Sequence, residues 1–456
     1  MPGSISAYAE LDARAIVRLI RTRALSCEEV AAAACTAIER HDGAIRAFAV
    51  GAGERALARA RELDRLDPSD AARLPLLGVP VAIKDIFDTA ELPTEYGSPI
   101  YRGHQPTADA AMVALLRAAG AIVVGKSKTA EFAGMFPPDT VNPLDPARTP
   151  GGSSSGSAAA VAARLVPLAT GTQTAGSVVR PASYCGVLGL KPTIGVVPLA
   201  GALPTSATLD TAGLFARSAD DLELALEAVA MVRADLASAR SGRPPGGAAA
   251  AAATPPAGPP RIALLRVAWE RLEDAARDAI DRYVDAAARA GAHVVERELP
   301  VGFDELAQAQ LTIQRVETAW TIGPEADRHG DAVSADLRAY IEAGRAVARS
   351  DYLAARRLAD EQRWPWEDRL ADVDCALAPS ALGVPPAGLG FSGDPLLCRP
   401  FTLLGGPALA IPGAWTAGGL PIGIQLAGPL HGDRRVLACA RWLARHVPAR
   451  AADAVQ

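Results

Sequence analysis

Apolar residues recur at helical spacing near the start of the chain. Ile16, Leu19 and Ile20 fall on one face of a helix. Ser26 stands directly before Glu28 and Glu29, where a serine hydroxyl is a favourable helix N-cap. This pattern predicts an N-terminal helical segment over residues 1–65.

Short apolar runs separated by helical patterns continue through the rest of the chain. The runs predicted as strands are Leu76–Asp85, Ala121–Val124, Val166–Ala169, Arg261–Leu265, Ala376–Pro379, Ala408–Pro412 and the alternating segment GLPIGIQLAGP. Helical patterns include Glu273–Gly291 and Arg434–His446. Because strands and helices alternate, the sequence predicts an α/β fold.

Composition limits the classes of possible partner, and one segment interrupts the pattern of helices and strands. Of the 456 residues, 50% are hydrophobic and 21% charged, and the net charge is −5. A sizeable core is therefore expected, and the charge favours neither nucleic acid nor an anionic membrane as a partner. Residues 233–260, which include RPPGGAAAAAATPPAGPP, are predicted to be a low-complexity loop.

The cysteines and the N-terminus bear on the compartment. The six cysteines are scattered without a CxxC pair, which is typical of buried thiols rather than a disulfide framework. The first twenty residues contain acidic and basic side chains instead of an uninterrupted apolar stretch, and no run of 18 apolar residues follows. We therefore expect a cytoplasmic protein. The six histidines lack metal-ligand spacing, so no metal site is predicted.

Two local motifs occur in the wrong context. Gly120–Ser127 fits the phosphate-loop pattern GxxxxGK[ST], but a helical pattern precedes it and its middle is an apolar strand. Gly152–Gly156 fits the G-x-S-x-G nucleophile elbow, but its lead-in is rich in proline rather than a strand. We interpret neither match as a functional site.

A second glycine- and serine-containing stretch is more informative. Gly171–Gly186 reads GTQTAGSVVRPASYCG, follows a predicted strand, and has Pro181 where it fits the first turn of a helix. Backbone N–H groups at such a turn can form an oxyanion hole, and Ser177 is well placed as a nucleophile. The alternative is a plain turn of small residues.

A lysine inside an apolar strand provides a candidate base. Lys84 ends the run Val79–Ile83, and a buried lysine is rare unless it is paired or functional. Desolvation lowers a lysine pKa, so the neutral amine becomes available as a general base. Asp85 points to the opposite face of a strand and need not oppose this. The alternative is a strand-end lysine whose amine reaches water.

Together these segments resemble the amidase signature hydrolases. The centre of the resemblance is GGSSSGSAAAVAARLVPLATGTQTAGSVVRPASYCGVLGLKPT, Gly151–Thr193. By position, the resemblance implies a catalytic triad of Lys84, Ser153 as the cis-serine, and Ser177 as the nucleophile, with the two serines 24 residues apart. It also implies a cis peptide bond between Gly152 and Ser153.

The resemblance extends to the oxyanion hole and to the fold. It implies an oxyanion hole formed by the N–H groups of Thr174, Ala175, Gly176 and Ser177. It implies a mixed central β-sheet covered by helices on both faces, and neither a cofactor nor a metal. Residues 1–456 would form one amidase domain, with the signature core at 70–230 and a C-terminal part, 261–456, completing the sheet.

Two positions near Ser177 bear on the geometry of the turn and on the substrate. Ala175 replaces a glycine that most members carry, which would cost roughly 1 kcal/mol if that residue needs a positive φ. Arg180 lies three residues after Ser177, and the pattern Ser-Val-Val-Arg is similar to malonamidase-like members, in which this arginine holds a substrate carboxylate. A structural ion pair for Arg180 is the equal alternative.

The resulting hypothesis is an amidase that hydrolyses a small linear carboxamide through an acyl-enzyme. Its partner would be a small-molecule amide, without nucleic acid or membrane, and a homo-oligomer is compatible with it. One alternative is the A subunit of a glutamyl-tRNA amidotransferase complex, which would share the triad. Another is a binding protein with a decayed triad, against which all three intact triad positions count.

Overall fold

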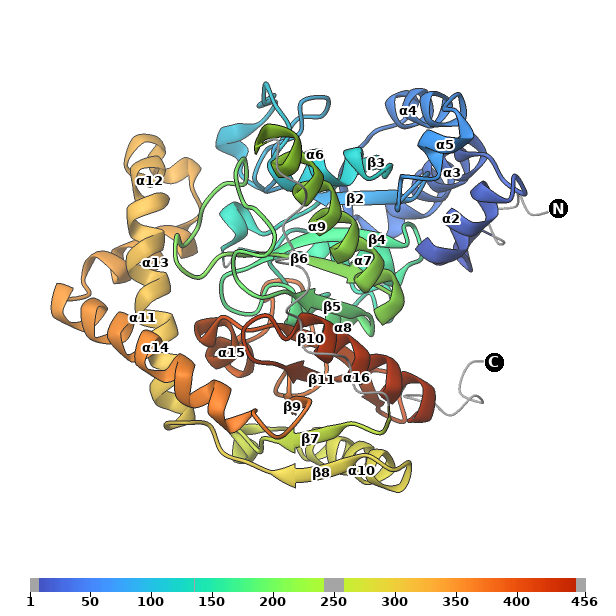
Figure 1. The fold of residues 1–456 in the computed structure, drawn as a ribbon. Coiled ribbons are helices and arrows are strands. Elements are labelled where there is room, and N and C mark those ends of the chain that lie inside the picture. The colour runs from blue at the N-terminus through green and yellow to red at the C-terminus, as the bar shows by residue number, and fades with distance from the viewer. Residues whose placement is uncertain (1–7, 135, 242–257, 448–456) are drawn as a thin grey trace.

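Eleven strands form one mixed β-sheet. The computed structural model describes residues 8–134, 136–241 and 258–447. Within them the strand order is β1-β3-β2-β4-β6-β5-β10-β11-β9-β7-β8 (Figure 1). The pairs β2–β3, β2–β4, β7–β8 and β7–β9 are parallel, and the remaining pairs are antiparallel. The predicted α/β fold with a mixed central sheet is confirmed.

The elements have the following bounds. The strands are β1 (Phe48–Gly51), β2 (Pro80–Lys84), β3 (Ile122–Ser127), β4 (Leu168–Gln173), β5 (Leu188–Lys191), β6 (Thr211–Ala216), β7 (Arg261–Leu264), β8 (His293–Glu296), β9 (Cys375–Pro379), β10 (Ala408–Trp415) and β11 (Pro421–Ala427). The helices are α2 (Ala13–Arg21), α3 (Cys27–Ile45), α4 (Glu54–Asp64), α5 (Pro68–Ala71), α6 (Ala111–Ala118), α7 (Ser155–Ala162), α8 (Val179–Cys185), α9 (Ala219–Ser241), α10 (Asp274–Arg289), α11 (Phe303–Thr321), α12 (Gly323–His329), α13 (Ala335–Arg345), α14 (Arg349–Arg369), α15 (Arg399–Leu404) and α16 (Asp433–His446).

Helices cover both faces of the sheet. On one face α9 packs against α16 and α6, and on the other α7 and α8 pack against the central strands (Figure 1). Helices α11 to α14 form a separate layer at one side of the sheet, and α11 packs against α13, α14 and α15. Among the described residues, no helix is both long and apolar enough to cross a membrane.

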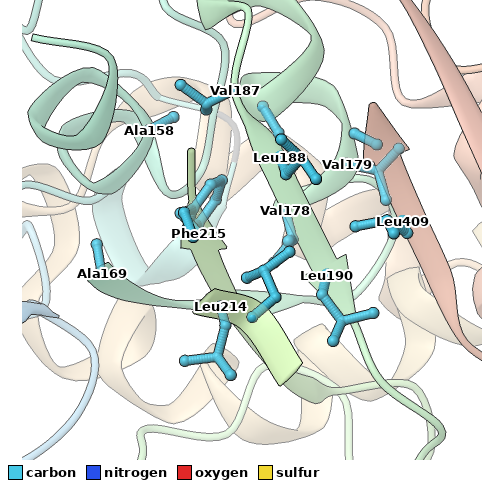
Figure 2. Packing of buried hydrophobic residues seen from close by; sticks show 14 of the residues in the cluster. Ala158, Ala169, Val178, Val179, Val187, Leu188, Leu190, Leu214, Phe215 and Leu409 are labelled. Carbon is cyan, nitrogen blue, oxygen red and sulfur yellow. The ribbon is translucent and has the colours of Figure 1, made fainter. Parts of the chain in front are cut away.

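The core around α8 shows how the sequence sets up close packing. Gly171 of β4 pairs with Gly213 of β6, and Val178 packs over this pair. Figure 2 shows Val178 among buried hydrophobic side chains that include Phe215. A Cβ atom on Gly213 would lie 2.7 Å from Cγ2 of Val178, so a side chain there would push Val178 away. Because Val178 directly follows Ser177, this packing fixes the height of the candidate nucleophile above the sheet.

The N-terminal segment differs from the prediction in one respect. Ser26 caps α3 as expected, and its hydroxyl and Glu29 form a reciprocal capping box. However, Phe48–Gly51 is not helical: it forms β1, which pairs antiparallel with β3 at the edge of the sheet. Burial alternates along β1, with the exposed residues at every second position. A strand of four residues is too short for this alternation to be recognised in the sequence.

The prediction of a low-complexity loop over residues 233–260 is wrong for residues 233–241. Residues 233–241 continue α9, because their alanine-rich sequence is compatible with a helix that starts in the core. Residues 242–257 of that loop lie outside the described residues. The two motif interpretations agree with the structure: Ile122–Ser127 is a strand, and no strand leads into Gly152.

Candidate active site

The serine loop is a turn held from several sides before α7 begins. The Gly152–Ser153 peptide bond is cis. The Ser155 hydroxyl donates to the Gly151 carbonyl at 2.7 Å, and the Ala130 N–H donates to the Ser153 carbonyl at 3.0 Å. Gly156 allows close approach here, since a Cβ atom on it would lie 2.1 Å from the Ala47 carbonyl oxygen. The loop is therefore fixed by its small residues and hydroxyl groups.

Lys84 lies at the end of β2 and is fully buried. Its Nζ donates to the Ser153 Oγ at 2.9 Å and to the Thr172 Oγ1 at 2.7 Å. No carboxylate lies within ion-pair distance of it in the described part of the chain. The neighbouring Asp85 instead contacts Lys126 at 3.0 Å, so it does not oppose deprotonation of Lys84 directly. The alternative interpretation, a strand-end lysine, requires the amine to reach water. The buried Lys84 amine does not.

The surroundings favour the neutral amine. Burial lowers the pKa of Lys84 to about 7, and the negative charge of Asp210 acts against this decrease. In a large fraction of the molecules the Lys84 amine is therefore uncharged at neutral pH and able to accept a proton.

Ser177 stands at the turn between β4 and α8. The Gln173 side chain accepts hydrogen bonds from the N–H groups of Val178 and Val179, at 2.9 and 3.0 Å, and so closes the start of the helix. Ser177 is 9% exposed, and its hydroxyl makes no hydrogen bond within the described residues. The structure thus brings Lys84 and Ser153 into contact and leaves the Ser177 hydroxyl free.

The backbone before Ser177 has its carbonyl groups occupied. The Thr174 carbonyl accepts from Gln310 at 2.7 Å, the Ala175 carbonyl accepts from Thr402 at 2.6 Å, and the Gly176 carbonyl accepts from the Arg180 N–H at 2.9 Å. Among the hydrogen bonds of the described residues, none is donated by the N–H groups of positions 174–177. These N–H groups are available to an oxyanion.

Ala175 does not strain this turn. Its φ is not among the positive values found at non-glycine residues of the described chain. The cost that a positive φ would impose on alanine is therefore absent, and the substitution of glycine by Ala175 is accommodated. Gly176 is different, because a Cβ atom on it would lie 3.1 Å from the Cβ atoms of both Pro395 and Cys398.

Arg180 is buried and only partly satisfied. Its Nη2 donates to the Gly152 carbonyl at 2.7 Å and to the Ser392 hydroxyl at 3.3 Å. Its Nε and Nη1 atoms have no hydrogen-bond partner, and no ion pair involving Arg180 occurs within the described residues. The structural ion pair considered from the sequence is not present there. Arg180 instead supports the serine loop and retains free donors.

Sequence reasoning missed several residues of the site. These are Thr172, Gln173, Asp210, Gln310 and Thr402. Two had a readable signal. Thr172 alternates with Thr170 on one face of strand β4, and Gln310 begins the row Gln310, Gln314 and Glu317, which is spaced for one face of α11. The other three are recognisable only from tertiary contacts. No cluster of histidine, cysteine, aspartate or glutamate that could hold a metal occurs among the described residues.

Comparisons with known proteins identify relatives over most of the chain. The family model described as Amidase matches residues 29–437. The A subunit of the glutamyl-tRNA(Gln) amidotransferase of Rhodopirellula baltica is 33% identical over 470 residues, covering 92% of this chain and 93% of that protein. The protein of Mycobacterium tuberculosis strain H37Rv named "Putative amidase AmiD" is 34% identical over 453 residues, covering 92% of this chain and 91% of that protein.

Solved structures are similar over nearly the whole chain. Native peptide amidase from Stenotrophomonas maltophilia has a TM-score of 0.78 at 28% identity, with 97% of this chain and 98% of that chain covered. A chain from a vestigial protein complex, connected with the evolutionary origins of an s-triazine catabolic enzyme, has a TM-score of 0.83 at 28% identity, with 96% and 99% covered. With a family match over most of its length, this chain belongs to the amidase family of amide-hydrolysing enzymes.

Proposed function

We propose that this chain hydrolyses a small linear carboxamide through a triad of Ser177, Ser153 and Lys84. The observation that carries the proposal is the contact of the Lys84 Nζ with the Ser153 Oγ, in a site where no carboxylate of the described residues pairs with the lysine. A buried amine bonded only to hydroxyl groups is a proton acceptor, because no directly bonded carboxylate compensates a permanent charge.

The steps follow from these groups. Ser177 attacks the amide carbonyl, and its proton passes through the Ser153 hydroxyl to neutral Lys84. The N–H groups of positions 174–177 stabilise the oxyanion. The proton returns from Lys84 to the leaving nitrogen, which departs as ammonia or an amine. Water then attacks the acyl-enzyme by the same route and releases the carboxylic acid.

The substrate is proposed to carry a free carboxylate near the reacting amide. Arg180 is 4% exposed, its Nε and Nη1 have no hydrogen-bond partner among the described residues, and it lies one helical turn beyond Ser177. A buried guanidinium with unused donors is costly unless an anion completes it. A short acidic amide would supply that anion.

A second candidate function is the A subunit of a glutamyl-tRNA amidotransferase. It is favoured by the 33% identity to such a protein over 92% of this chain. The triad chemistry would be shared, but the enzyme would work in a complex rather than alone. The two functions are separated by assaying the purified chain without partners: an independent amidase hydrolyses simple and acidic amides, whereas a chain that requires its complex does not.

Covalent labelling tests the nucleophile. We expect a fluorophosphonate to modify one residue, Ser177, in the intact chain, identified by mass spectrometry of peptides. Ser154→Ala is the matched control, since Ser154 lies beside the cis-serine and its hydroxyl, within the described residues, bonds only the Thr172 carbonyl, at 3.4 Å. Labelling lost in Ser177→Ala and retained in Ser154→Ala supports the proposal. An unlabelled intact chain would instead favour a binding protein with a decayed triad.

A further inference from the structure

Asp210 lies where the two central strands of the site end. Strands β4 and β6 are antiparallel, and Gln173 pairs with Thr211. The next opposed positions are therefore Thr174, the first residue of the candidate oxyanion turn, and Asp210. Sequence reasoning gave Asp210 no role, and the proposed triad does not use it.

The Asp210 carboxylate is fully engaged. Its Oδ1 accepts from the Thr174 hydroxyl, and its Oδ2 accepts from the N–H groups of Thr205 and Ser206 at 2.7 and 2.9 Å. These bonds join the turn before Ser177 to the segment that precedes β6. Charge-assisted bonds of this kind are stronger than neutral ones, so the carboxylate is a fixed anchor for the turn.

The same carboxylate acts on Lys84. Thr172, which accepts a hydrogen bond from the Lys84 Nζ, lines a cavity of about 150 Å³ together with Asp210. Most of the remaining lining is apolar: Leu199, Ala202, Leu203, Pro204 and Ala207. In such a low-dielectric setting the charge of the Asp210 carboxylate interacts strongly with a proton on the Lys84 amine.

The other charged groups near these two residues already have partners. Asp85, next to Lys84 in the chain, contacts Lys126. Glu317 of α11 accepts from the Ser206 hydroxyl and faces Tyr352 and Arg356. Asp210 is thus the carboxylate whose charge acts on Lys84.

We propose that Asp210 is a positioning residue of the amide hydrolysis, holding the oxyanion turn through Thr174 and supplying the negative charge against which Lys84 takes up its proton. The inference rests on the proposed function. Burial raises the pKa of Asp210 to about 6, while its three hydrogen bonds and Lys84 act in the opposite direction. The carboxylate is therefore mostly ionised where Lys84 titrates.

The test separates the charge from the anchor. In Asp210→Asn the side-chain oxygen can still accept from the N–H groups of Thr205 and Ser206, and the amide nitrogen can donate to the Thr174 hydroxyl, but the charge is removed. The Lys84 ammonium then loses its counter-charge, so the pKa of Lys84 falls. We expect the acid limb of the kcat/KM profile to move by about one pH unit to lower pH. Thr174→Val removes the anchor bond but keeps the charge, so it should lower kcat and leave the limb in place.

Asp433→Asn is the matched control. Asp433 is also buried and accepts from the N–H and the hydroxyl of one threonine, Thr193, but near Lys191 instead of Lys84. It should leave the acid limb unchanged. If Asp210→Asn does not fold, Asp210→Glu keeps the charge but displaces it, and should lower kcat at least tenfold with a smaller shift of the limb.

The outcomes are distinct. A limb that stays in place in Asp210→Asn, or a kcat unchanged in Asp210→Glu, overturns the inference while leaving the amidase triad intact. Failure of the proposed function would look different, because wild-type activity would then survive Ser177→Ala.

Discussion

Three lysines of this chain are fully buried, and their partners differ. Lys126 contacts the Asp85 carboxylate, Lys191 donates to the carbonyl groups of Pro192 and Gly406, and Lys84 donates to two hydroxyl groups. A carboxylate stabilises an ammonium, whereas a hydroxyl can pass a proton on. At the scale of the residue, the partners rather than burial alone distinguish the candidate base.

The triad variants test this assignment. We expect Ser177→Ala to abolish acyl-enzyme formation, and Lys84→Ala and Ser153→Ala each to lower kcat by orders of magnitude. Because triad members act as a unit, a double variant should lose little more than the worst single one. Steady-state kinetics measures kcat, and intact-mass spectrometry measures formation of the acyl-enzyme. A near wild-type kcat in Lys84→Ala at neutral pH would contradict the role of the lysine.

The pH profile tests the same base without disrupting it. Lys84 accepts a proton only when neutral, and its pKa is about 7. The kcat/KM value should therefore fall as the pH drops through this region and level off above it. Single His→Ala variants are the control, since a histidine titrates in the same range. Loss of the acid limb in one of them, with the fold intact, would identify a histidine as the base.

Arg180 calls for a comparison of two substrates. Arg180→Ala removes the donor to the Gly152 carbonyl as well as the free donors, so some loss with every amide is expected. In this variant kcat/KM for an acidic amide should fall ten- to hundredfold further than kcat/KM for a neutral amide of equal size. Ser392→Ala is the control, because it removes a neighbour of Arg180 but keeps the charge. Equal losses for both amides would leave Arg180 a purely structural role.

At the scale of the element, the site depends on how β4 turns into α8. Gln173 ends the strand and caps the helix, and its Nε2 donates to the Thr402 hydroxyl at 2.9 Å. Thr402 in turn donates to the Ala175 carbonyl, so α15 holds the turn through a residue more than two hundred positions away. The candidate oxyanion turn, residues 174–177, is thus held in part by the C-terminal part of the chain.

Removing one hydroxyl tests this link. Thr402→Val keeps the shape of the side chain but leaves the Ala175 carbonyl unpaired, and we expect kcat to fall about tenfold. The free energy of unfolding should fall by about 1–3 kcal/mol. Thr140→Val is the matched control, since this buried hydroxyl donates to the Arg46 carbonyl at 2.8 Å, outside the site. It should cost similar stability without lowering kcat, and an equal loss of kcat in both would argue against a specific role of Thr402.

The sequence predicts the parts of this arrangement that are local. The apolar run ending at Lys84, the small-residue turn around Ser177 and the helix starting near Val178 are all present. Strand β1 and the helical extension at 233–241 were missed, because β1 is too short for its periodicity to be recognised and the sequence of 233–241 has no clear apolar period. The contacts of Asp210, Gln310 and Thr402 depend on which strands and helices meet, and local pattern carries no such information.

At the scale of the whole molecule, strands from both halves of the chain complete one sheet. Strand β10 pairs with β5 on one side and β11 on the other, so the C-terminal strands continue the signature core directly (Figure 1). One domain over the whole chain remains our proposal, and this continuity supports it. The sheet also contributes to the burial of Lys84, because β2 is an inner strand between β3 and β4 and α7 packs against it.

A buried lysine with a lowered pKa should reduce the stability of the whole molecule. An unfolded lysine titrates near pH 10.5, whereas Lys84 titrates at about 7. Between these values the unfolded chain binds more protons, so the free energy of unfolding rises with pH. In Lys84→Met this contribution is absent. The variant should therefore be more stable than the wild type by a few kcal/mol at pH 7, although inactive.

Chemical denaturation at pH 7, 8.5 and 10 measures the difference. We expect the advantage of Lys84→Met over the wild type to shrink steadily as the pH rises, because the wild-type lysine then no longer needs to lose a proton on folding. Ser177→Ala is the control: it is equally inactive but removes no titrating group in this range, so its difference from the wild type should not vary with pH. A constant difference for Lys84→Met as well would mean that Lys84 is charged in the folded protein, and the proposed base would fail with it.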